Sequence, residues 1–161
     1  MTDPTIELKA SPPRRFIAAF VLFVTGALLL WIAMTSPPAS VGWLIFLLVI
    51  GGVILWAAMR LWQATASTMT LTDEALVDSS GTVLCHIDNM RAVERGIFAF
   101  KPSNGFLIRM HKPVGKGWAP GMWWRFGTRL GVGGVTPSAQ AKAMADIIAL
   151  RLSGAGDVLK D

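Results

Sequence analysis

The sequence predicts a two-helix transmembrane hairpin followed by a small α+β domain. Three observations support this fold class. Residues 16–59 contain no Asp, Glu, Lys or Arg, although charged residues make up 16% of the 161-residue chain. Two apolar runs within this stretch are separated by a short loop that contains two prolines. The residues that follow alternate apolar and polar positions between glycine-rich turns, which is typical of β-strands.

The two apolar runs, residues 16–34 and 41–59, each have the length of a membrane-spanning helix. Nineteen helical residues measure about 28 Å, close to the hydrocarbon thickness of about 30 Å. Pro37 and Pro38 end the first helix, and so short a connection predicts an antiparallel hairpin. The hairpin is expected to occupy residues 16–62, because Trp62 extends the aromatic residues at its end. Residues 1–15 and 154–161 are expected to be tails.

The positive charges predict the orientation of the hairpin. Arg14 and Arg15 precede the first run and Arg60 follows the second, whereas the loop between the runs is uncharged. Both termini of this multi-pass protein are therefore expected on the cytoplasmic side of a bacterial inner membrane. The alternative is a signal peptide, twin-arginine or ordinary, cleaved near Ala39. A retained second helix would still leave the following domain inside.

Neither apolar run contains an ionisable residue, and proton relays and ion pathways normally need one within the membrane. The hairpin is therefore interpreted as an anchor and not as a transporter. Gly26 and the pair Gly51-Gly52 have two interpretations. They let the two helices approach closely, or they reflect the general abundance of glycine in membrane helices. We favour the second interpretation.

Residues 63–153 are expected to form one small domain with a C-terminal helix. Strands are expected at residues 65–72, 75–78, 82–86, 90–97, 106–110, 122–126 and 129–132, with a Gly- and Pro-rich loop at 112–121. Thr136 as N-cap, Pro137 at the first position and Gly154 at the end define a helix over residues 137–152. This order predicts a bent antiparallel sheet or a partly open barrel that the helix caps.

The order of elements resembles the pleckstrin-homology-like domains of small bacterial membrane proteins, in which a transmembrane hairpin precedes such a domain. The resemblance covers the layout from Phe16 to Leu152. Its most specific segment is FGTRLGVGGVTPSAQAKAMADIIALRL, residues 126–152, where a last strand and a glycine turn lead into the capping helix. The resemblance implies a pleckstrin-homology-like fold. Some relatives bind phosphoinositides or proteins and others have diverse roles, so the fold does not transfer a function.

The stretch of residues 111–129, HKPVGKGWAPGMWWRFGTR, is the main candidate site. It contains three tryptophans and four basic residues but no acidic residue. Lys and Arg can engage headgroup phosphates while Trp rings settle in the interfacial region. Either the stretch contacts the cytoplasmic leaflet or a partner subunit, or its tryptophans fill the core. The lipid- or partner-contact candidates are Arg109, Lys112, Lys116, Trp118, Trp123, Trp124, Arg125 and Arg129.

Trp123 and Trp124 must face opposite sides of a strand, so at least one of them is expected outside the core. The net charge of +5 beside a membrane favours anionic lipid as a partner. The positive residues are scattered and not arranged in a stripe, so nucleic acid is not expected as a partner. A membrane protein or a second copy of the chain is the other partner class.

No catalytic or metal site and no cofactor are expected. Cys85 and His86 are neighbours on a strand and point to opposite faces, and His111 is expected to be exposed. The segment 115–117 lacks the spacing of a phosphate-binding loop, and the glycines of 131–134 are interpreted as bend and turn residues. The single cysteine excludes an internal disulfide.

Two classes of function follow from the sequence. The first is a membrane-anchored, non-enzymatic binding or scaffold protein that presents a basic β-domain at the cytoplasmic membrane face. The second is an accessory subunit of a larger membrane complex. A lipid-acting enzyme would need a convergent polar site, which the sequence does not show.

Overall fold

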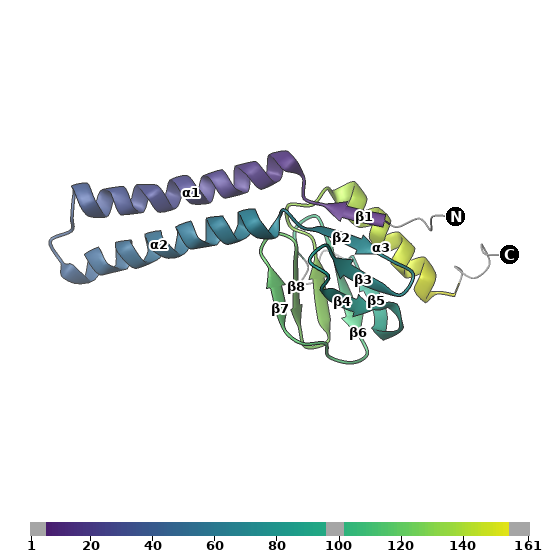
Figure 1. Ribbon diagram of the computed structural model, residues 1–161. Helices are drawn as coiled ribbons and strands as arrows, with labels where there is room; N and C mark the ends of the chain where they lie inside the picture. Colours follow the sequence, from purple (N-terminus) through teal and green to yellow (C-terminus); the bar gives the residue numbers. More distant parts are fainter. Residues whose placement is uncertain (1–5, 96–101, 155–161) are drawn as a thin grey trace. The chain divides into compact units, whose positions relative to one another are not determined.

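The computed structural model describes residues 6–95 and 102–154 and divides the chain into two compact units. One unit consists of residues 12–63 and contains helices α1 (Pro12–Thr35) and α2 (Val41–Ala64). The other unit takes in residues 1–11 and everything from residue 64 onward. It contains the β-strands and a C-terminal helix (Figure 1).

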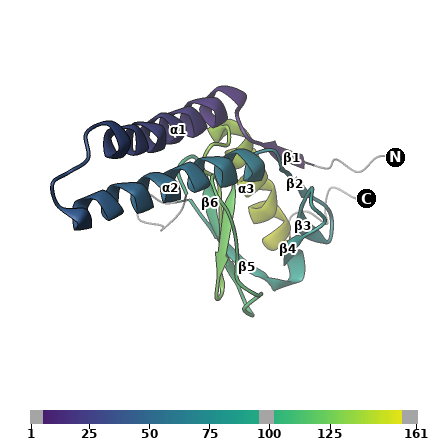
Figure 2. The ribbon, with the colours of Figure 1, turned by 60° about the vertical axis from the view of Figure 1, so that its left-hand side comes forward.

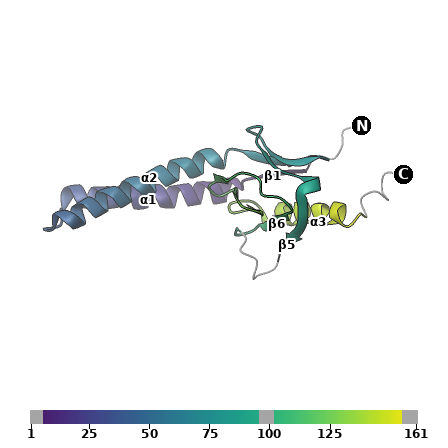
Figure 3. The ribbon, with the colours of Figure 1, turned by 90° about the horizontal axis from the view of Figure 1, so that it is seen from below.

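The helical unit is an antiparallel hairpin, whose two helices run side by side (Figures 1 and 3). Each helix has 24 residues, and both are long and apolar enough to cross a membrane. The predicted pair of long helices is confirmed, but each helix extends beyond its apolar run. Pro12 begins α1, a position that suits proline because its missing N–H has no intrahelical partner there. Arg14 and Arg15 therefore belong to the first turn of α1.

The two helices are in close contact at Gly26 and Gly51. A Cβ atom added to Gly26 would lie 2.9 Å from Cγ of Leu55 and 3.1 Å from the carbonyl oxygen of Gly51. A Cβ atom added to Gly51 would lie 2.8 Å from Cδ2 of Leu30, whereas one added to Gly52 would have nothing within 4 Å. The interpretation that composition alone explains the glycines is thus wrong for Gly26 and Gly51, and it stands for Gly52.

Replacing Gly51 with leucine is expected to destabilise the hairpin by about 1–3 kcal/mol, because the new side chain would overlap Leu30 of α1. Gly52→Leu is the matched control, since its side chain enters open space. SDS titration of the full chain in mixed micelles measures the difference. Equal SDS midpoints for the two variants would contradict a glycine-mediated contact.

The β-unit contains two antiparallel sheets among the described residues. The first sheet has the order β1-β2-β3-β4, and its strands are β1 (Ile6–Lys9), β2 (Thr68–Leu71), β3 (Ala75–Asp78) and β4 (Val83–His86). The second has the order β5-β6-β9-β8-β7, and its strands are β5 (Met90–Glu94), β6 (Phe106–Met110), β7 (Gly117–Ala119), β8 (Trp123–Phe126) and β9 (Arg129–Val132). A short 3₁₀ helix, Ile87–Asn89, connects them.

The predicted antiparallel strands with a C-terminal helix are confirmed. The strands form two sheets instead of one bent sheet, and neither sheet is closed. The 3₁₀ turn between β4 and β5 breaks the run of hairpins, so these two strands do not pair. The strand expected at 90–97 ends at Glu94, and residues 96–101 lie outside the described part.

Two strands lie in segments where none is expected. Strand β1 belongs to the segment expected to be an N-terminal tail, yet it pairs with β2 and its Leu8 is completely buried opposite Met69. Strand β7 lies inside the expected loop of residues 112–121 and pairs with β8. The three residues of β7 are too few to show a periodic pattern, whereas the apolar-polar alternation of IELK in β1 is a signal that the assignment to a tail overlooked.

Helix α3 (Ser138–Leu152) lies beside both sheets, against β1, β5 and β6 (Figure 2). The predicted helix is confirmed, and four of its residues, Ala141, Met144, Ala145 and Ile148, are buried on one face. The predicted N-cap is wrong, because Pro137 occupies that position without a side-chain hydrogen bond. Thr136 is buried instead, and its hydroxyl donates to the carbonyl oxygen of Asn104 at 3.4 Å.

Arginine side chains attach α3 to the strands. Arg151 donates to the carbonyl oxygen of Thr72 at 2.6 Å and to the carboxylate of Asp73 at 2.9 Å. Arg95, which directly follows β5, forms an ion pair with Asp146 of α3. Both contacts lie in the C-terminal half of α3 and attach it to the turn after β2 and to the end of β5.

Candidate functional site

The five-stranded sheet separates the predicted contact residues onto its two faces. Side chains alternate along a strand, so Trp124 and Phe126 of β8 lie on one face while Trp123 and Arg125 lie on the other. Trp123 is buried, with 8% of its surface exposed, whereas Trp124 is half-buried and Phe126 is 64% exposed. The expectation that one of the two neighbouring tryptophans lies outside the core is therefore confirmed.

The face that carries Trp124 and Phe126 gathers aromatic and basic side chains from four segments. Trp118 of β7 is directly opposite Trp124, and Arg129 of β9 is directly opposite Phe126. Arg109 of β6 is in turn opposite Arg129. Lys116 places its Nζ atom 5.2 Å from the centre of the Phe126 ring. We call this the basic aromatic face; its members are Arg109, Lys116, Trp118, Trp124, Phe126 and Arg129.

The basic aromatic face is exposed and carries more positive than negative charge. Trp118 is 59% exposed, and a shallow hollow of about 400 Å³ lies between it and Phe126. Arg109 pairs with Glu94 at 2.5 Å. Among the described residues, neither Lys116 nor Arg129 is within ion-pair distance of a carboxylate. Like charges directly opposite one another in a sheet are destabilising, so the Arg109–Arg129 pair does not serve stability.

Gly131 leaves the space that the Trp124 indole occupies on the sheet. The two residues are directly opposite each other in β9 and β8. A Cβ atom on Gly131 would lie only 2.3 Å from Nε1 of Trp124, so no side chain other than hydrogen leaves room for the indole. The interpretation of Gly131 as a bend or turn residue is therefore wrong, whereas Gly133 and Gly134 have φ angles of +138° and +126° that suit a turn.

Arg125 lies on the opposite face and is held by backbone carbonyls. Its Nε donates to Gly115 at 2.6 Å, and its Nη1 donates to Val83 at 3.0 Å and to Leu84 at 2.7 Å. Val83 and Leu84 belong to β4, so this one side chain connects the two sheets. Arg125 was a contact candidate by composition, but the structure separates it from the basic aromatic face.

Lys112 also lies apart from the strands of the basic aromatic face. Asn89 holds its backbone, accepting from the Lys112 amide at 2.8 Å and donating to the Lys112 carbonyl at 3.0 Å. Its side chain is exposed. Phe126 is the one member of the face that the sequence analysis did not name. Its spacing of two residues from Trp124 in an expected strand is the signal that could have identified it.

The groups considered for catalysis are not assembled into a common site. Cys85 is buried while His86 is exposed, as their neighbouring positions on a strand predict. Burial raises the pKa of the Cys85 thiol to about 11, although the positive charge of Arg125 acts in the opposite direction. His111 is exposed. Among the described residues, no three His, Cys, Asp or Glu side chains are close enough together to hold a metal ion.

Comparison with protein-family models, with curated proteins and with solved structures finds no match to this chain. The structure itself therefore defines the class of protein. It combines two long apolar helices with a small antiparallel β-unit that exposes a basic aromatic face.

Proposed function

We propose that this chain is a membrane-anchored, non-enzymatic binding protein whose basic aromatic face binds anionic lipid headgroups. In this proposal α1 and α2 span the cytoplasmic membrane of a bacterium, with both termini on the cytoplasmic side. The exposed side chains of the two helices are mostly large and apolar, which supports a lipid environment. Arg14, Arg15 and Arg60 all lie near the same end of the hairpin, which supports that orientation.

The β-unit is proposed to be a pleckstrin-homology-like domain. Antiparallel strands precede a C-terminal helix that packs on both sheets, and this order supports the assignment. The additional strand β1 comes from the other side of the hairpin in the sequence. The domain is thereby completed by residues on both sides of the hairpin, so its two connections to α1 and α2 limit its distance from the bilayer.

The composition of the basic aromatic face is the observation that carries the proposal. Trp118 and Phe126 are exposed and Trp124 is half-buried beside them. Lys116 and Arg129 of the same face are not within ion-pair distance of a carboxylate in the described part of the chain. This combination has the chemistry of a membrane interface. Each Lys or Arg near an anionic surface contributes about 1 kcal/mol. The attached hairpin makes the contact intramolecular, so a few such contributions are enough to keep the face on the bilayer.

Lys116→Glu is expected to weaken the contact of the face with anionic lipid by roughly 2 kcal/mol, since it removes a positive charge and adds a negative one. The full chain is placed in nanodiscs of phosphatidylcholine, with or without phosphatidylglycerol, that carry brominated acyl chains. The difference in emission between the native chain and Trp118→Phe isolates the fluorescence of Trp118. Bromine quenching of that signal should depend on phosphatidylglycerol and should fall in a Lys116→Glu background.

Lys142→Glu is the matched control. Lys142 is an exposed residue of α3, and its substitution changes the net charge by the same amount as Lys116→Glu. It should leave the quenching of Trp118 unchanged. If quenching of Trp118 is equal with and without phosphatidylglycerol, or if Lys142→Glu reduces it as much as Lys116→Glu does, the face is not a binding surface for anionic lipid. The function would then be sought in the accessory-subunit class.

A further inference from the structure

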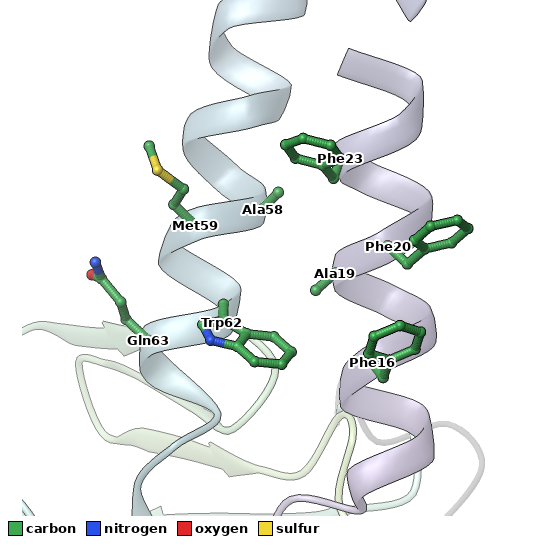
Figure 4. Close-up of a pocket in the computed structure, with 8 residues that line it drawn as sticks. All are labelled: Phe16, Ala19, Phe20, Phe23, Ala58, Met59, Trp62 and Gln63. Carbon is green, nitrogen blue, oxygen red and sulfur yellow. The ribbon is translucent and has the colours of Figure 1, made fainter. Parts of the chain in front are cut away.

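The helical unit contains an open apolar groove near the end of the hairpin that carries the arginines (Figure 4). Its volume is about 320 Å³, at the lower end of the range for small-molecule sites. Ala19 of α1 and Ala58 of α2 face each other across it, while the rings of Phe23 and Trp62 extend from opposite helices toward it. Small side chains at the base and large ones at the rim create the groove.

The walls of the groove are suited to a hydrocarbon chain. Phe16, Phe23, Met59 and Trp62 keep between 47% and 59% of their surface exposed, so they present apolar area that nothing in the hairpin covers. Gln63, at one end, is the one polar side chain among the eight that line the groove. From Phe16 to Phe23 the groove runs for about 10 Å along α1, which corresponds to part of an acyl chain.

Positive charge marks the end of the groove at Phe16 and Trp62. The guanidinium of Arg15 lies 4.1 Å from the centre of the Trp62 ring, and its Nη2 donates to the Trp62 carbonyl at 2.9 Å. That carbonyl is among the last four of α2, which lack an intrahelical donor. The Nε atom of Arg15 is buried and has no hydrogen-bond partner among residues 6–95 and 102–154, which is unfavourable unless an acceptor approaches.

The helical unit offers no acidic group to this charge. Arg14, Arg15 and Arg60 lie within a stretch, residues 8–72, that contains no Asp or Glu. A second copy of the hairpin would bring the same arginines and no carboxylate, so it would add repulsion. The occupant that matches the groove must therefore combine an apolar chain with an anionic group.

We propose that the groove binds one anionic phospholipid, with an acyl chain between Ala19 and Ala58 and the phosphate beside Arg15. This inference rests on the proposed membrane insertion, but it does not depend on the basic aromatic face. The phosphate accepts the unpaired N–H of Arg15, a charge-assisted hydrogen bond. The acyl chain covers the apolar rim, whose residues belong to both helices, so the lipid also joins α1 to α2.

The test uses the full chain, purified in mild detergent after reconstitution with equal amounts of phosphatidylglycerol and phosphatidylcholine of the same acyl chains. Native mass spectrometry then counts the lipids retained on each chain. We expect about tenfold more phosphatidylglycerol than phosphatidylcholine to be retained. Phosphatidylglycerol has a net negative charge that can pair with Arg15, whereas the headgroup of phosphatidylcholine has no net charge. Arg15→Gln should abolish this preference, whereas Lys142→Gln, an exposed residue of α3, should keep it.

Ala19→Leu, which fills the base of the groove, should lower the retention of phosphatidylglycerol about tenfold, and Ala18→Leu is its matched control outside the lining. Equal retention of the two lipids, or unchanged retention in Ala19→Leu, would overturn the lipid site. A dimer that dissociates in Ala19→Leu would also overturn it and would assign the groove to a second copy. Resistance of the native chain to alkaline extraction tests membrane insertion separately, so a failed lipid site leaves the proposed function standing.

Discussion

Replacing Gly105 with alanine is expected to lower the free energy of unfolding of the β-unit by at least about 3 kcal/mol. We expect no other added methyl group to have a larger effect. A Cβ atom at this position would lie 1.9 Å from the carbonyl oxygen of Val132 and 2.7 Å from Cα of Gly133. Both atoms belong to the backbone, so no side-chain rotation can relieve the overlap. The strand β6 would have to separate from β9.

Urea unfolding of the full chain in detergent, followed by tryptophan fluorescence, measures this effect, because three of the seven tryptophans, Trp118, Trp123 and Trp124, lie in the β-unit. Gly115→Ala is the matched control: a Cβ there meets nothing within 4 Å, and its φ angle is not positive. We expect the control to stay within about 0.5 kcal/mol of the native chain. Similar midpoints for the two alanine variants would show that β6 and β9 do not approach as closely as the structure places them.

Arg125→Met is expected to destabilise the β-unit by about 2–3 kcal/mol. The substitution keeps the apolar stem but removes the donors that serve Gly115, Val83 and Leu84. A hydrogen bond that involves a charged group contributes about 1.5–3 kcal/mol, and a carbonyl left without a donor adds a penalty where water cannot reach it. Arg125 is half-buried, so water can donate to some of the carbonyls that lose the guanidinium. The expected loss of stability is therefore smaller than the sum of three hydrogen-bond contributions.

Arg129→Met is the control for this variant, because Arg129 lies four residues away, is exposed and has no carboxylate partner among the described residues. Its stability should remain within about 0.5 kcal/mol of the native value, or should rise slightly as the repulsion from Arg109 is removed. The two variants should also differ in function. Only Arg129→Met should reduce the phosphatidylglycerol-dependent bromine quenching of Trp118 without a loss of stability. If Arg125→Met showed that result instead, Arg125 would be the lipid contact and Arg129 the structural residue.

Local patterns were sufficient to predict the long helices and most of the strands. Apolar runs of membrane length and a double proline require no tertiary information. The short apolar run FLIRM at 106–110, which follows the Ser-Asn-Gly turn at 103–105, marks β6 within its actual bounds. Strand β1 was not predicted, although its four residues, IELK, alternate apolar and charged positions, because so short a run near the N-terminus was assigned to a tail. Its pairing with β2 joins segments about sixty residues apart, and only the folded chain brings them together.

The candidate site was predicted in composition but not in arrangement. The tryptophans and basic residues of 111–129 were named from the sequence, yet strand alternation moves Trp123 and Arg125 to one face and leaves Trp118, Trp124 and Arg129 on the other. The register of β6, β8 and β9 adds Phe126 and sets Arg109 against Arg129. Register is a property of paired strands, so it cannot be read from any one of them.

The sequence alone determined that this chain has two uncharged apolar helices next to a basic β-rich segment, because both features depend only on composition and local periodicity. The tertiary structure decided which glycines join the helices, which arginine connects the two sheets and which side chains form the basic aromatic face. It also determined which residues of the two helices line the apolar groove beside Arg15. These features depend on distances between residues far apart in the sequence, and only packing sets such distances.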